Sequence, residues 1–147
     1  MKEIIKSDNI NIENMIYEIR GVEVMLDSDL ARLYQCTNGT KDINKAVKRN
    51  ANRFPSDFYF QLSIEEYTFL RSQIGTLKSG RGFHKKYLPY VFTEQGVTML
   101  ATILRTKVAE EVSIRIMDAF VVMRKYISSN LIEQQYINNR NLKLANN

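Results

Sequence analysis

Residues 27–53 read DSDLARLYQCTNGTKDINKAVKRNANR. Asp27 is a suitable helix N-cap, and the apolar residues at 30, 31, 33 and 34 can form one side of a short helix. Residues 35–39 end in Asn-Gly, a pair that readily adopts the backbone conformations of a turn. Thr40 can cap a second helix, and Asp42 in its first turn suits the positive end of the helix dipole. The stretch therefore predicts a helix-turn-helix element.

The second predicted helix, residues 41–53, has two unlike faces. At about 100° per residue, apolar and polar side chains separate along it. The apolar side consists of Ile43, Val47, Ala51 and Phe54. The polar side presents cations and amides, namely Lys41, Asn44, Lys45, Lys48, Arg49, Asn52 and Arg53. Pro55 ends the helix, because proline cannot continue it.

These polar residue types are the ones that duplex DNA requires. Lys and Arg neutralise phosphates and contact guanine edges, and Asn can pair with adenine through two hydrogen bonds. The alternative is a solvated amphipathic helix. Such helices usually carry Glu among the Lys as salt-bridge partners, and residues 41–53 contain no Glu. We therefore expect double-stranded DNA to bind the polar side of this helix.

Positive charge gathers in two segments of the 147-residue chain, whose formal net charge is +5. Residues 41–53 hold five basic residues and one acid, and residues 71–86 hold five more and no acid. Such clustering indicates an anionic partner more strongly than the total charge does. The second segment places four cations on a glycine-rich loop: Lys78, Arg81, Lys85 and Lys86. They can follow the phosphate backbone as a wing, or form a solvated loop that also holds His84.

The other patterns predict a small sheet. Residues 16–20 and 22–26 are strand-forming and flank Arg20-Gly21, which predicts a β-hairpin. Residues 58–62 and 87–92 predict two further short strands. The strands and the helices together indicate an α+β fold, a small single domain.

Helices are predicted at three further places. Ser63 and Glu66 form a capping box that opens a helix to about residue 73, and Thr93 can cap a helix to about residue 104. A long C-terminal helix follows at residues 107–127. We expect residues 1–14 to be a polar leader, residues 15–127 the folded domain, and residues 128–147 a polar tail, helical or frayed.

The C-terminal helix carries two apolar stripes. One follows a heptad-like seam: Ala109, Val112, Ile116, Ala119, Met123 and Tyr126. The second consists of Ile114, Met117 and Val121. One stripe can pack on the domain while the other meets a second copy, and we assign a possible homodimer to the seam. The alternative is a central helix buried on both sides within one chain.

Other function classes find little support. Cys36 is the single cysteine, which excludes an intramolecular disulfide and a cysteine-based zinc site. The sequence contains no Walker loop, dinucleotide-binding fingerprint, paired metal ligands at helical spacing or Gly-x-Ser-x-Gly elbow. We expect neither an enzyme nor a cofactor. With no secretory signal and no membrane-length apolar run, we expect a cytoplasmic protein that does not enter the membrane.

The sequence closely resembles the ORF-six N-terminal domain family, phage and prophage DNA-binding modules related to KilA-N. Three stretches carry the resemblance: IYEIRGVEVMLDSDLARLY at residues 16–34, KAVKRNANRFPSDFYFQL at residues 45–62, and YLPYVFTEQGVTM at residues 87–99. The resemblance covers about residues 15–127 and implies a compact, KilA-N-like α+β domain that binds DNA. The turn at residues 35–40 is about two residues longer than in the common form, and we expect no long C-terminal effector region.

Two functional hypotheses follow. The first is a DNA-binding transcriptional regulator of phage or prophage type. The alternative is an antirepressor that acts on a repressor protein, with residues 109–127 as its docking surface. DNA binding weakens steeply with salt because counterions are released, whereas apolar docking does not.

Overall fold

The structure, a computed structural model, describes residues 11–74 and 88–145. Its centre is a four-stranded antiparallel sheet in the order β1-β2-β4-β3. The strands are β1 (Ile16–Ile19), β2 (Val22–Leu26), β3 (Tyr59–Gln61) and β4 (Tyr90–Thr93). The described helices are η2 (Ile12–Met15), α1 (Asp27–Leu33), α2 (Thr40–Arg49), η3 (Ala51–Arg53), α3 (Ile64–Ile74), α4 (Glu94–Leu104) and α5 (Lys107–Ala145), where η marks a 3-10 helix. The predicted α+β class is confirmed.

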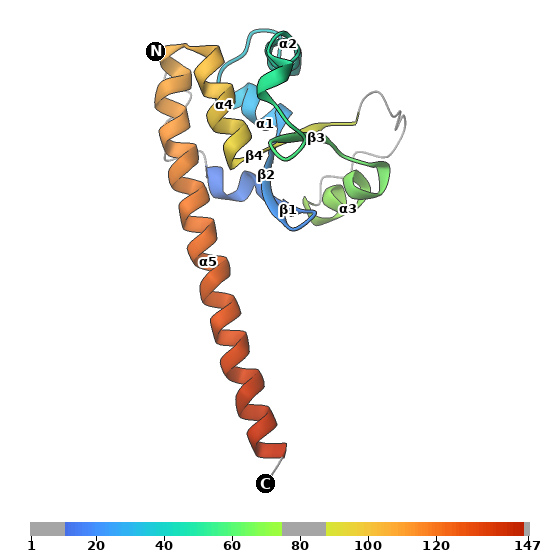
Figure 1. Ribbon diagram of the computed structural model, residues 1–147, viewed down its shortest axis with the longest axis vertical. Helices are drawn as coiled ribbons and strands as arrows, with labels where there is room; N and C mark the ends of the chain where they lie inside the picture. The colour runs from blue at the N-terminus through green and yellow to red at the C-terminus, as the bar shows by residue number, and fades with distance from the viewer. Residues whose placement is uncertain (1–10, 75–87, 146–147) are drawn as a thin grey trace.

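The sheet separates two apolar cores because successive side chains of a strand point to opposite faces. Met25 and Phe92 are fully buried in the larger core, which α1, α2, α4 and α5 share. Val24 and Val91 face a smaller core that Leu70 of α3 closes. In Figure 1, α4 and α5 lie to one side of the sheet and α3 lies to the other.

The predicted hairpin is confirmed, with Ile19 opposite Val22 at its closed end. Arg20 (φ 57°) and Gly21 (φ 77°) both take the left-handed conformation, as a two-residue turn of this hand requires. The guanidinium of Arg20 donates to both carboxylate oxygens of Glu66 in α3, at 2.7 and 3.0 Å. The turn is thereby anchored to the helix on the smaller core.

Two predicted helix caps are present. The hydroxyl of Ser63 accepts from the backbone N–H of Glu66 at 3.1 Å, and the N–H of Ser63 donates to the Glu66 carboxylate at 2.8 Å. The hydroxyl of Thr93 accepts from the N–H of Gly96 at 3.2 Å. Any Cβ at Gly96 would collide with the carbonyl oxygen of Phe58, so glycine lets α4 begin close against the chain that enters β3.

Secondary structure continues into both segments that flank the predicted domain, the leader and the tail. Ile12 of η2 is only 5% exposed and belongs to the larger core, so the folded part begins before residue 15. At the other end, α5 continues to Ala145 and projects far from the domain body (Figure 1). Residues 1–10 lie outside the described residues.

Most of the seam of α5, to which the sequence assigned a possible homodimer, is covered within a single chain. Ala109, Val112, Ile116 and Ala119 are all buried in the larger core of one chain. Of the other two seam residues, Met123 is half-buried and Tyr126 is exposed. The heptad-like spacing arises because this face packs against the domain, and the stripe that stays exposed contains Ile114 and Val121.

Candidate nucleic-acid interface

A tight turn joins α1 to α2. Gln35 (φ 58°) and Gly39 (φ 61°) both adopt left-handed backbone conformations. The N–H of Cys36 donates to the carbonyl of Ala31 at 2.9 Å, which closes the end of α1. Together these features complete the helix-turn-helix element that the sequence predicts.

The start of α2 is fixed by Asp42. Its carboxylate accepts from the backbone N–H of Asn38 at 3.0 Å and from the side-chain amide of Asn38 at 3.2 Å. These bonds lower the pKa of the Asp42 carboxyl. The predicted capping role of Thr40 is wrong, because α2 begins at Thr40 itself and its N-cap is Gly39, which makes no side-chain bond.

The two faces of α2 differ as the sequence predicts. Ile43 and Val47 are buried, where α2 packs on α1 and α4. The cations Lys41, Lys45, Lys48 and Arg49 are all exposed. Within residues 11–74 and 88–145, none of these four forms an ion pair. The helix lies at one end of the molecule (Figure 1), so its charged face meets solvent.

The predicted helix over residues 41–53 is interrupted at Asn50. Its side-chain amide donates to the carbonyl of Ala46 at 2.9 Å and its backbone (φ −128°, ψ 38°) leaves the helical region. Asn52 and Arg53 are exposed on η3, so they do not continue the line of lysines. Ala51 is exposed and not part of the apolar face.

Phe54 reaches the core by a different route from the one predicted. It follows η3 with a non-helical backbone (φ −126°, ψ 75°), because the residue before a proline avoids helical angles. Its ring meets Tyr59 and Phe92 edge-on, at centroid distances of 5.9 and 6.1 Å. The buried ring fixes the end of η3 against the sheet.

Asn44 is turned inward, which contradicts its predicted place on the DNA-facing side. It is half-buried and hydrogen-bonds to the carboxylate of Asp27. That carboxylate is 5% exposed and also accepts from the backbone N–H of Tyr90 at 3.2 Å. Burial raises the pKa of Asp27, although these donors oppose the shift. Asp27 is thus the first residue of α1, not its N-cap, and it joins α1, α2 and β4.

Sequence reasoning missed two further cations. Arg105 and Lys107 are exposed at the connection between α4 and α5, which lies at the same end of the molecule as α2 (Figure 1). Arg105 adopts a left-handed conformation (φ 53°) as the C-cap of α4. The sequence does contain a sign of them, because Arg105 and Lys107 flank Thr106 between two segments with helical periodicity.

The second basic cluster falls outside the described residues. This applies to Lys78, Arg81, Lys85 and Lys86, and to His84.

Within the described part of the chain, no group of three or more His, Cys, Asp or Glu residues is placed to hold a metal ion. In the same part, no helix has the length and hydrophobicity needed to traverse a lipid bilayer. Burial raises the pKa of the Cys36 thiol.

Comparison with known proteins gives one match. The model of the ORF6N domain matches residues 14–103, which include the hairpin, the helix-turn-helix element and almost all of α4. No curated protein and no solved structure gives a significant match.

Proposed function

The chain belongs to the ORF6N domain family, and on this basis we propose that it binds duplex DNA through the exposed face of α2. One observation carries the proposal. Lys41, Lys45 and Lys48, with Arg49 beside them, share one exposed side of a helix whose other side is buried. Because no described acid pairs with them, their charge is available to phosphates.

The dimensions of α2 suit the major groove. Its ten residues span about 15 Å at about 1.5 Å per residue, and the groove of B-DNA, about 12 Å wide, admits a helix. Lys45, Lys48 and Arg49 contact bases and nearby phosphates. Asn52 and Arg53 follow on η3, where Asn52 reaches a base edge and Arg53 contacts the adjacent phosphates.

Asn44 has a different role in this proposal. Because its amide bonds to Asp27, it holds α2 at a fixed position on α1 and β4 and does not read a base. The cations Arg105 and Lys107 extend the positive surface at the same end of the molecule. The loop cations Lys78, Arg81, Lys85 and Lys86 add phosphate contacts as the predicted wing.

We propose that the protein acts as a transcriptional regulator of phage or prophage type. The second candidate is an antirepressor that binds a repressor protein. The exposed stripe of α5 favours this candidate, because Ile114 is 66% exposed and Val121 is 38% exposed. Contiguous exposed apolar side chains are typical of protein-binding surfaces.

A salt titration tests the DNA proposal. The full-length chain is added to a fluorescent 20-base-pair duplex at several salt concentrations, and anisotropy reports the affinity. We expect log affinity to fall linearly with log salt, with a slope of about −0.9 for each phosphate contact. Absence of binding at low salt, or a slope near zero, would refute the proposal and favour the protein-binding candidate. Selection from a random duplex library then identifies any preferred sequence.

A further inference from the structure

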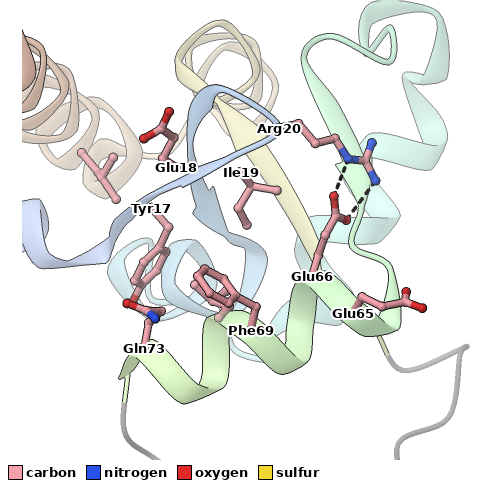
Figure 2. Close-up of a pocket in the computed structure, with 10 residues that line it drawn as sticks. Tyr17, Glu18, Ile19, Arg20, Glu65, Glu66, Phe69 and Gln73 are labelled. Atoms are coloured by element: carbon pink, nitrogen blue, oxygen red, sulfur yellow. Dashed lines mark hydrogen bonds and ion pairs between the residues drawn. The ribbon is translucent and has the colours of Figure 1, made fainter.

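A groove of about 590 Å³ runs between β1 and α3. Five consecutive residues of the hairpin, 16–20, form one wall, and Glu65, Glu66, Phe69, Leu70 and Gln73 of α3 form the other. Figure 2 shows Tyr17 and Ile19 directed toward α3, and Phe69 directed back toward them. The groove is separate from α2, which lies at the opposite end of the domain body (Figure 1).

The groove follows the free edge of the sheet. The side chains of one sheet face would come from alternate residues, but here every residue from Ile16 to Arg20 borders the groove. In the order β1-β2-β4-β3, β1 is an edge strand that pairs with β2 among the described residues. Because Ile19 and Val22 flank a two-residue turn, the alternation of the ladder directs the backbone N–H and C=O of Glu18 outward.

The floor of the groove is apolar. Ile19 and Leu70 are buried beneath it, and both belong to the smaller core. Phe69 is 65% exposed, the most exposed of the large apolar side chains that line the groove. A sheet edge accepts an added peptide strand through two features: backbone N–H and C=O groups that point outward, and an apolar channel that receives alternate side chains. The edge of β1 has both.

The rim of the groove is acidic. Arg20 is already paired with Glu66 at 2.7 Å, so its charge is neutralised. Glu18 and Glu65 form no ion pair within the described residues, and Figure 2 shows both side chains directed away from the apolar floor. A second copy paired through the same strand would bring two acidic rims together, and like charges on adjoining strands repel.

We propose that this groove binds an extended segment of a partner protein in which apolar and basic residues alternate. The segment adds to β1 as a fifth strand. Its apolar side chains enter the channel beside Phe69, and its Lys or Arg side chains meet Glu18 and Glu65. Because the groove and α2 lie at different ends of the domain body, the chain can hold such a partner and DNA at the same time.

Peptide display tests this proposal on the full-length chain. One library of nine-residue peptides has random apolar residues at odd positions and Lys or Arg at even positions. The control library has Asp or Glu at the even positions. We expect enrichment from the basic library alone, and at least a tenfold loss of affinity for the selected peptides when Phe69→Ser or Glu18→Lys is introduced.

The matched control variant is Ile114→Ser, since Ile114 is 66% exposed and Phe69 is 65% exposed. It removes a similarly exposed apolar side chain elsewhere and is expected to leave peptide affinity unchanged. Hydrogen exchange provides a second readout, because strand addition slows exchange of the Glu18 amide. No enrichment, equal binding by the Phe69→Ser variant, or an unchanged Glu18 exchange rate would each overturn the proposal.

Discussion

Asp27 connects three elements through one buried carboxylate. It begins α1, accepts from the N–H of Tyr90 in β4 at 3.2 Å, and bonds to Asn44 of α2. A charged group in such a site is costly unless it is well hydrogen-bonded, and burial raises its pKa above the ordinary 3.8. The orientation of α2, the helix that we propose binds DNA, therefore depends on a buried residue outside its exposed face.

The raised pKa predicts a specific dependence of stability on pH. The native state binds the Asp27 proton more tightly than the unfolded state, so this contribution to stability is complete at low pH. It is lost as pH rises through the raised pKa, and amounts to about 1.4 kcal/mol for each unit of the shift. Urea unfolding of the wild type and of Asp27→Asn between pH 4 and pH 7 measures it. The stability of the wild type relative to the variant is expected to decline with pH, and a constant difference would contradict this assignment.

The two asparagines of the polar side are expected to behave differently. Asn44→Ala removes a donor to the buried Asp27 carboxylate and lowers the free energy of unfolding by about 1–3 kcal/mol. Asn52→Ala alters an exposed side chain, so it leaves stability unchanged and shifts the DNA sequence preference. Urea unfolding and duplex selection measure the two effects. A stable Asn44→Ala variant with altered sequence preference would instead make Asn44 a reader.

At the level of elements, hydrophobic periodicity predicted the faces of the helices but not the positions at which the helices end. Helical spacing correctly separated Ile43 and Val47 from the exposed lysines. The pattern could not show that Asn50 would bond back to Ala46 and end α2, because that bond competes with helix continuation locally. Asn44 lies between the two faces, where periodicity alone does not decide burial. The direction of the Asn44 side chain is set by its hydrogen bond to Asp27. The two residues become neighbours only in the tertiary fold.

The stripes of α5 illustrate the same limit. Both have helical spacing, and the sequence cannot say which one the domain covers. The structure buries Ile116 completely and leaves Ile114 66% exposed. The turn, the capping box of Ser63 and Glu66, and the Thr93 cap were predictable because they are local, whereas the choice between stripes depends on contacts with η2 and α4.

A matched pair of substitutions tests this choice. Ile116→Glu places a charge in the larger core and is expected to unfold the domain, since a buried unpaired charge is strongly destabilising. Ile114→Glu changes an exposed position two residues away and is expected to preserve the circular dichroism spectrum and the melting temperature. A folded Ile116→Glu variant would contradict the assigned core face. If two copies pair through the exposed stripe, sedimentation shows Ile114→Glu reduced to the 17.2 kDa monomer.

For the whole molecule, the distribution of charge over the surface is more informative than the net charge. The net charge is only +5, yet α2 presents four exposed cations without described ion pairs at one end. The groove beside β1 presents Glu18 and Glu65, which form no ion pair within residues 11–74 and 88–145. The family match ends at residue 103, but Ile116 and Phe120 of α5 complete the larger core. The long helix is therefore part of the folded domain as well as an extension from it.

The affinity of a variant with Lys45, Lys48 and Arg49 all changed to Ala tests the central claim most directly. These side chains are exposed, so the variant is expected to stay folded. Duplex affinity at low salt is expected to fall at least tenfold, and the salt slope by about 2–3 units if each contacts a phosphate. As a matched single-lysine comparison, Lys45→Ala is expected to weaken binding more than Lys125→Ala, which changes an exposed lysine of α5. Unchanged affinity and slope in the folded triple variant would contradict the claim that α2 binds DNA.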